Sequence, residues 1–346
     1  MKKIVMTFMS LVAFFGMAEA QNSVSMSAVA LEPGGTATLS IDVTNEVTFT
    51  AFVLTLNLPD GITIAEALNE DDELAPDVAL TERKKSDHTV SVNVANGKIA
   101  SFSATNKTFR DASGTLVTVT LQASSTAKGG LYPITISDAA LTDTEGTDYP
   151  MEDVSTIAVV KGEMTLSYTM TDAGWGTLIV PFDHSLPTGL TAYTCDGYTT
   201  SEGLNWLTLA KATTLAANTP YIVAGAAGTY ELTGTPSVAN TTYSEGLLTG
   251  VYVPTSVAEG YVLQKQSDEV AFFQIAEGSP KTVPAYRCYM DNAPSGAIAF
   301  RLYGATGVKN LTEEEAGMLY DLQGRGFEGT TENGIYIRNG KLIMVK

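Results

Sequence analysis

The side chains that most often carry acid–base or nucleophilic chemistry are scarce in this 346-residue chain, which has only two histidines and two cysteines. His88 follows Asp87, but neighbours on a strand point to opposite faces, so the two do not form a proton-transfer pair and we expect His88 on a surface hairpin. His184 lies in the phrase Pro-Phe-Asp-His and is expected at the end of a strand. Histidine-based catalysis therefore has few candidates.

Known catalytic motifs are also missing from the sequence. It contains no Gly-x-Ser-x-Gly, His-Glu-x-x-His or Gly-x-x-x-x-Gly-Lys pattern. A glycosidase that uses two carboxylates remains an alternative, since its two acids can lie far apart in sequence. We expect a protein that is not an enzyme and that has no cofactor.

The two cysteines, Cys195 and Cys288, allow two interpretations. An oxidising compartment would permit a disulfide between them, and closing so long a loop would stabilise the fold by about 4–5 kcal/mol in the chain-entropy model. Alternatively, each is a separate buried thiol that packs as a small apolar side chain. The sequence does not decide between them.

Aromatic side chains suggest a ligand platform in the second half of the chain. Trp206 follows the polar stretch 201–205, and Tyr198 lies nearby, so the two could stack on sugar rings. Trp175 is expected in the core, because large aromatics usually anchor cores.

The charge balance excludes some partners. With 20 basic and 38 acidic residues the net charge is −18, which repels nucleic acid and anionic lipid. The acidic run 69–73 and the acids around Gly146 lack the spacing of a calcium loop and are predicted to be polar turns. No metal site is expected.

The composition favours strands over helices. The sequence holds 46 Thr, 31 Gly, 13 Pro and 15 Tyr, residues typical of pleated strands and tight turns. Alternating stretches such as 38–43 and 52–58 put apolar residues on one face, and Asn96-Gly97 predicts a two-residue hairpin that pairs Val94 with Ile99. We predict an all-β protein of two β-sandwich-like domains with a C-terminal β-hairpin tail. Its segments are 1–20 (signal peptide), 21–160 (first sandwich), 161–308 (second all-β domain) and 309–346 (linker and hairpin tail).

The first twenty residues are typical of an export signal. Lys2 and Lys3 precede the apolar run 4–17, and Ala-Glu-Ala then predicts cleavage between Ala20 and Gln21. A retained anchor is the alternative, but about fourteen apolar residues are fewer than the ~20 that span a bilayer. We expect an exported protein with no transmembrane segment in the mature chain.

The phrases LEPGGTATLSIDV, AFVLTLNLPDGITI and GTLVTVTLQASSTAKGGLYPITISDAAL carry a family resemblance. They resemble cohesin-like sandwiches of bacterial extracellular proteins, a fold related to carbohydrate-binding modules. The resemblance implies a face or edge that holds a protein partner or presents an adhesive surface. No dockerin repeat occurs in the chain, so such a partner would come from elsewhere.

The later phrases GWGTLIVPF, LAANTPYIV and VPAYRCYM resemble a domain of secreted and surface proteins of gut-type anaerobes. The end of the chain, 318–325 and 334–346, resembles a short type IX secretion sorting signal, which implies a Gram-negative envelope. A simple packed hairpin that pairs Ile337 with Leu342 and Ile335 with Met344 is the alternative.

Together these features predict an exported, non-catalytic binding protein at the cell surface, adhesin-like or cohesin-like, whose partner is an unidentified protein or glycan. Glycan capture through Trp206 and Tyr198 is the first alternative. A secreted hydrolase is the second, and a structural surface-layer role is the third.

Overall fold

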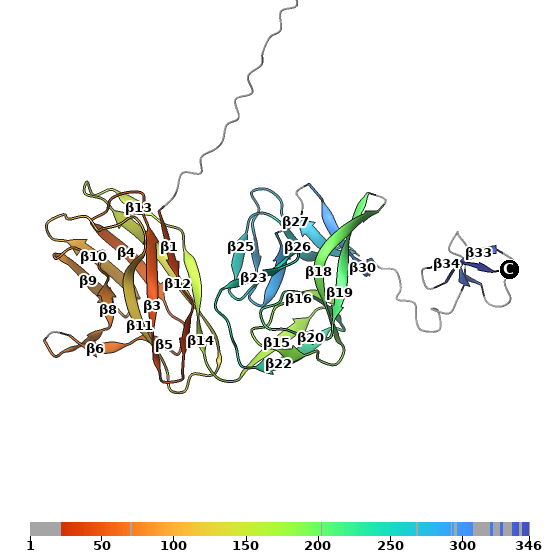
Figure 1. The fold of residues 1–346 in the computed structure, drawn as a ribbon, viewed down its shortest axis with the longest axis horizontal. Helices are drawn as coiled ribbons and strands as arrows, with labels where there is room; N and C mark the ends of the chain where they lie inside the picture. Colours follow the sequence, from red (N-terminus) through yellow and green to blue (C-terminus); the bar gives the residue numbers. More distant parts are fainter. Residues whose placement is uncertain are drawn as a thin grey trace, which may run out of the picture.

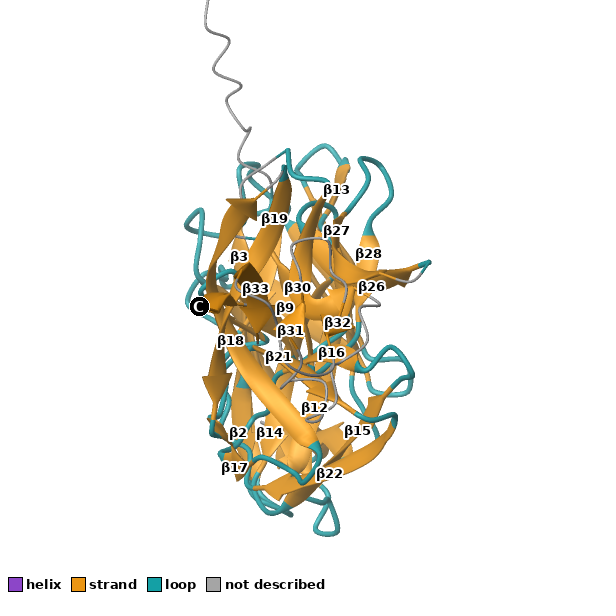
Figure 2. Cartoon of the chain, turned by 90° about the vertical axis from the view of Figure 1, so that its right-hand side faces the viewer, coloured by secondary structure: helices purple, strands orange, loops and turns teal. Residues whose placement is uncertain are grey.

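The computed structural model describes residues 22–306, except 70, 202, 268, 292, 294 and 295, and the backbone of four short strands between 319 and 345. All regular structure in these residues is β, as Figure 2 shows, so the predicted all-β class is confirmed. The strands gather into two bodies joined at residues 161–163, and a small sheet follows (Figure 1). The signal peptide with Ala20 and Gln21, and the connector at 309–318, lie outside the described residues.

The first body is a sandwich of two sheets. The first sheet has the order β1-β3-β11-β5 with β8 also on β11, and its strands are β1 (Ser23–Met26), β3 (Thr36–Thr44), β11 (Thr115–Ala123), β5 (Ile62–Ile64) and β8 (Val78–Leu80). The second has the order β2-β14-β12-β4-β10-β9 with β13 also on β12, and its strands are β2 (Val29–Leu31), β14 (Val154–Val160), β12 (Gly130–Thr142), β4 (Ala51–Asn57), β10 (Lys98–Ser103), β9 (His88–Asn93) and β13 (Asp148–Pro150). A separate hairpin joins β6 (Glu66–Leu68) and β7 (Leu74–Pro76).

The space between these two sheets is filled by apolar side chains that occupy every second position of their strands. On β4, Phe52, Leu54 and Leu56 are buried, as the pattern of 52–58 predicts, whereas the residues between them are half-buried. Side chains from β3 and β11, including Leu39, Ile41 and Val119, close the same core from the opposite sheet. A sandwich of this kind buries one face of each sheet and leaves the other available.

The β9–β10 hairpin differs from the predicted one. Ile99 pairs with Val92 rather than with Val94, so the loop spans four residues, 94–97. The Asn93 side chain accepts a hydrogen bond from the Ala95 amide at 3.1 Å, and Gly97 at the end of the loop has a φ of +69°. The Asn93 side chain closes the longer loop at its start, and the Leu56 amide on β4 donates to the Gly97 carbonyl at its end.

The second body is built on one long sheet. Its order is β16-β21-β18-β19-β30-β27-β26-β29-β24-β23, and the strands are β16 (Trp175–Leu178), β21 (Tyr221–Gly225), β18 (Leu190–Ser201), β19 (Leu204–Ala212), β30 (Ala299–Thr306), β27 (Glu269–Gln274), β26 (Tyr261–Gln266), β29 (Arg287–Met290), β24 (Leu248–Val251) and β23 (Thr242–Glu245). Three two-stranded pieces accompany it: β15 (Met164–Met170) with β22 (Gly228–Gly234), β17 (His184–Ser185) with β20 (Thr214–Leu215), and β25 (Thr255–Val257) with β28 (Lys281–Val283).

The long sheet curls so that strands distant in its order meet. The Cys288 amide on β29 donates to the Thr177 hydroxyl on β16 at 2.9 Å, and the Ile179 amide donates to the Tyr286 carbonyl at 3.2 Å. β16 is first in the order and β29 is eighth. This contact brings β15, β16 and β29 around one shared space.

The two bodies pack against each other through β14. Its residues Ile157 and Val159 point away from the first core and lie in an apolar cluster with Val253 of the second body. The junction is also fixed, because the Lys161 amide donates to the Leu31 carbonyl at 2.8 Å. Both faces of β14 are therefore covered.

The C-terminal sheet has the order β32-β31-β33-β34, with strands β31 (Leu319–Tyr320), β32 (Gly326–Phe327), β33 (Gly334–Arg338) and β34 (Lys341–Val345). Ile337 pairs with Leu342 and Ile335 with Met344, which confirms the predicted hairpin register. Its turn residues 339 and 340 lie outside the described residues.

Candidate functional site

The outer face of the second sheet in the first sandwich carries side chains that alternate with those of the core. The register places twelve side chains on it in three rows across β9, β10, β4 and β12, and these rows are Thr89-Phe102-Ala51-Thr142, Ser91-Ala100-Val53-Ala140 and Asn93-Lys98-Thr55-Ser137. None of the twelve is buried. We call this surface the β9–β12 face.

The chemistry of the β9–β12 face is unusual for a chain with so many acids. Lys98 is the one charged residue among the twelve, and the others are Thr, Ser, Ala, Val, Asn and Phe. Asp148 extends the first row onto β13, where it accepts a hydrogen bond from the Thr142 hydroxyl at 2.7 Å. Phe102 is 56% exposed, and Val53 is half-buried in the adjacent row. Protein interfaces have cores depleted of charge and enriched in aromatic anchors, and this surface shares both properties.

Alternation explains why Phe102 faces outward. Ile99 and Ser101 on β10 are buried inward, so Lys98, Ala100 and Phe102 must face outward. The next strand, β9, is the last in the sheet order and contains neither proline nor lysine. An edge without these residues can accept an additional strand, so a partner could use the edge as well as the face.

A second apolar feature lies at the β6–β7 hairpin. Leu68 and Leu74 form a cross-strand pair, and both are more than 60% exposed. Leu74 and the exposed Val94 line an open hollow together with polar residues that include Asp60 and Glu66. The acids make this hollow less suited than the β9–β12 face to the uncharged core of an interface.

The predicted ligand platform is not formed as one surface. In the β18–β19 hairpin Tyr198 pairs with Leu207 and Thr199 pairs with Trp206, so Tyr198 and Trp206 lie on opposite faces of the ribbon. The Tyr198 ring packs edge-on against Phe300, with centroids 5.0 Å apart, while Trp206 is half-buried. The prediction relied on their nearness in sequence, but the hairpin register puts the two rings on opposite faces.

The two cysteines are free, buried thiols, which agrees with the second of the two interpretations and not with the bridge. Cys195 lies in the cluster around Leu207 and Phe272, whereas Cys288 lies beside Ile179 and Tyr252. Burial raises the pKa of the Cys195 thiol to about 11 and that of the Cys288 thiol to about 12. Both thiols stay protonated at neutral pH.

The histidines are occupied by structural contacts. His88 is buried, which corrects the expected surface position, because its ring packs on Phe109 with centroids 3.8 Å apart. Its Nδ1 accepts a hydrogen bond from the Lys85 amide at 2.9 Å. Asp87 instead accepts hydrogen bonds from Thr105 and Ser103, which hold its pKa well below the usual range. His184 contacts the carbonyl of the next residue.

The acidic stretches form turns. Asn69 accepts hydrogen bonds from the amides of Asp71 and Glu73 at the tip of the β6–β7 hairpin. Asp143 accepts from the amides of Glu145 and Thr147, and the Thr147 bond contributes most to its lowered pKa. Among the described residues no group of three or more His, Cys, Asp or Glu could hold a metal ion.

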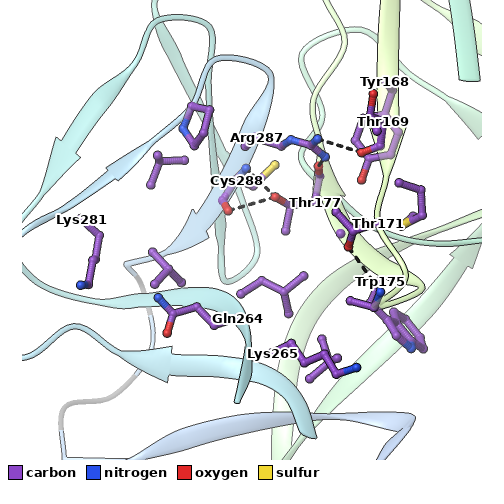
Figure 3. A pocket seen from close by; sticks show the side chains of 18 of the residues that line it. Tyr168, Thr169, Thr171, Trp175, Thr177, Gln264, Lys265, Lys281, Arg287 and Cys288 are labelled. Atoms are coloured by element: carbon purple, nitrogen blue, oxygen red, sulfur yellow. Dashed lines mark hydrogen bonds between the residues drawn. The ribbon is translucent and has the colours of Figure 1, made fainter. Parts of the chain in front are cut away.

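A cavity in the second body was not predicted from the sequence. It measures about 410 Å³ and lies between β15–β16 on one side and β26, β28 and β29 on the other (Figure 3). Trp175, which the sequence placed in the core, lines it and is half-buried. Its other lining residues come from segments about a hundred positions apart, so no local pattern could have joined them.

Comparison with models of protein families gave no match, and comparison with curated proteins gave none either. Solved structures with similar folds include the cohesin of a type I cohesin–dockerin complex from Clostridium thermocellum, at 11% identity and TM-score 0.32 over 40% of this chain and 94% of that one. A non-cellulosomal cohesin from the archaeon Archaeoglobus fulgidus has 14% identity and TM-score 0.29 over 40% and 91%. A cohesin from R. flavefaciens in complex with a group 1 dockerin has 13% identity and TM-score 0.32 over 41% and 96%. Similarity at this level does not indicate what this chain binds.

The part of the chain that the structure describes contains no helix with the length and apolar character needed to cross a membrane.

Proposed function

We propose that this chain is a non-catalytic binding protein, exported to the cell surface, that holds a protein partner on the β9–β12 face in the manner of an adhesin or a cohesin-like module. The observation that carries the proposal is the composition of this face, in which three rows of side chains include one charge and an exposed Phe102. A surface open to water normally carries more charge, because charged groups keep it solvated and unattached.

The energetics favour Phe102 as the anchor of such an interface. Fully burying an exposed phenylalanine side chain contributes about 1.5–3 kcal/mol, and the 56% of Phe102 that is exposed can contribute the corresponding part. The flanking Thr, Ser and Ala side chains are short, so a partner can approach the sheet closely around the ring. The face gives the contact its apolar centre, and Lys98 and Asn93 form part of a polar rim.

Several properties support the absence of catalysis in this proposal. The two thiols are protonated at neutral pH because burial raises their pKa values. The buried ring of His88 packs on Phe109. Export to the surface rests on the leader-like residues 1–20 and on the tail that resembles a sorting signal.

Glycan capture by Trp206 and Tyr198 has weaker support, because their register puts them on opposite faces of the hairpin.

The test compares three forms of residues 21–346: wild type, Phe102→Asp and the control Ile298→Asp. Ile298 lies in the second body and is 83% exposed, so the control makes the same kind of substitution at an unrelated exposed position. Each form is used to capture proteins from the outer envelope of the source cells. Captured proteins are identified by mass spectrometry, and their affinity is then measured with the purified partner by calorimetry.

We expect a partner that binds wild type and Ile298→Asp equally and binds Phe102→Asp at least about tenfold more weakly, since a charge would be desolvated at the centre of the contact. Thermal melting should be the same for the three forms, because both substituted side chains are exposed. A partner that binds Phe102→Asp with unchanged affinity would refute this site, and the failure of wild type to bind any envelope protein would refute the proposed function.

A further inference from the structure

The charged residues that line the cavity of the second body are all positive. Its nineteen lining residues include three cations, Lys265, Lys281 and Arg287, and no aspartate or glutamate. The whole chain has almost twice as many acids as bases, 38 against 20. A cavity lined by cations alone in such a chain concentrates positive potential at one place.

Arg287 is held with its charge uncompensated. Its Nη1 donates to the Thr177 carbonyl and its Nη2 to the Thr169 carbonyl, each at 3.1 Å (Figure 3). The guanidinium lies over the Tyr168 ring, 4.1 Å from its centroid. The ion pairs among the described residues do not include Arg287, Lys265 or Lys281. The guanidinium is therefore fixed in orientation, and N–H groups remain for a ligand.

Tyr168 supports Arg287 from beneath. Its side chain is only 3% exposed, and its ring lies under the guanidinium. The hydroxyl interacts with the Arg287 side chain and lies against Gly176, where an added methyl group would collide with it. Because this oxygen is buried, Tyr168 positions Arg287 and does not itself contact a ligand.

Trp175 adds a flat apolar wall to the cavity. Its ring stacks against Tyr193, with centroids 6.0 Å apart and planes 30° apart, and the side chain stays half-buried. Thr171, Thr282 and Gln264 also line the space with hydroxyl and amide groups that are not buried. This combination fits a sugar ring that carries a carboxylate, because it offers the flat Trp175 ring, hydroxyl and amide groups, and cations.

We propose that this cavity binds an acidic oligosaccharide, whose carboxylates are attracted by Arg287, Lys265 and Lys281 on separate sides of the cavity and one of whose sugar rings rests against Trp175. A volume of about 410 Å³ lies within the range of small-ligand sites. The site belongs to the second body and is independent of the proposed protein partner of the first. Neutral sugars lack the group that the cations attract, and the −18 charge of the chain opposes non-specific binding of any polyanion.

The test is calorimetric titration of residues 21–346 with trigalacturonic acid at low ionic strength. Its fully methyl-esterified form is the neutral probe, and an oligoglutamate of equal charge is the non-sugar probe. The variant Lys265→Gln/Lys281→Gln removes two charges whose side chains are exposed, and Lys128→Gln/Lys211→Gln removes two equally exposed charges that do not line the cavity. Arg287 is left intact because it also packs on Tyr168.

We expect wild type and the control variant to bind trigalacturonic acid equally, the cavity variant to bind at least about tenfold more weakly, and the affinity to fall as salt is added. The methyl ester and the oligoglutamate should bind at least about tenfold more weakly than the acid. No binding of the acid, equal binding of the ester or of oligoglutamate, or an unchanged affinity in the cavity variant would each overturn the proposal.

Discussion

Burial determines the chemistry of the two thiols more than any neighbouring residue. For Cys195 and Cys288, desolvation is the largest cause of the raised pKa, which reaches about 11 and about 12 from an ordinary value of 9.0. The unfolded thiols would therefore ionise first as pH rises. Unfolding then releases protons between about pH 9 and pH 12, so the free energy of unfolding falls across this range and is unaffected by these groups below it.

We predict that both cysteines are unreactive in the folded protein. At pH 8 a thiol reagent such as Ellman's reagent should modify neither residue, because each is buried and protonated. In denaturant without a reductant, the same reagent should titrate two thiols per chain. A denatured chain that yields no thiol until it is reduced would establish the Cys195–Cys288 bridge that the sequence left open.

The grouping of individual side chains into sites was the feature hardest to predict from the sequence. Periodicity identified which side chains leave the core, but not which exposed side chains face one another. Trp206 and Tyr198 looked adjacent and lie on opposite faces. Tyr168, Lys265 and Arg287 looked unrelated and line one cavity, because the curl of the long sheet brings their strands together.

At the level of elements, alternation predicted strands well and turns less well. The buried positions of β4 and the pairs of the C-terminal hairpin agree with the sequence pattern. The β9–β10 loop does not, since Asn93 and Gly97 close four residues instead of two. A contact outside the hairpin supports the four-residue loop, because the Leu56 amide on β4 donates to the Gly97 carbonyl at 2.8 Å.

We predict that Gly97→Ala destabilises the first sandwich more than Gly61→Ala does. Both glycines have positive φ values, +69° and +88°, so both substitutions carry the left-handed penalty of about 1–2 kcal/mol. An added methyl group at Gly97 would also collide with the Leu56 carbonyl, whereas at Gly61 it would meet open space. Urea unfolding should show an additional loss of about 1–3 kcal/mol for Gly97→Ala.

The Gly61→Ala variant is the control for backbone strain. Both positions have a positive φ, but only at Gly97 does an added methyl group meet another part of the chain. Equal losses of stability would mean that the loop backbone at Gly97 does not approach β4. The four-residue loop would then lose its tertiary support.

For the whole molecule, β14 determines how the two bodies associate. Its run Ile157 to Val160 is buried on both faces, which is typical of strands covered on two sides. The sequence shows this run as continuously apolar, but nothing local indicates that a second domain covers the outer side. Val238 and Val253 of the second body do so, and they come from two separate segments.

We predict that Ile157→Asp uncouples the two bodies without unfolding the first. The Ile157 side chain is fully buried, yet it belongs to the cluster between the bodies and not to the core of the sandwich. An unpaired carboxylate there should disfavour the contact by several kcal/mol. Calorimetry should then show two separate melting transitions in place of one, and small-angle scattering should show a larger radius of gyration.

The control for this prediction is Thr55→Asp, which places the same charge on the outer face of the same sheet, two strands away on β4. Thr55 is half-buried and lies outside the cluster, so this variant should keep a single transition and an unchanged radius. If Ile157→Asp also keeps both, the bodies are held by the short connection at 161–163 and not by the apolar contact. Two transitions in the wild type would lead to the same conclusion, because bodies coupled through a buried cluster unfold together.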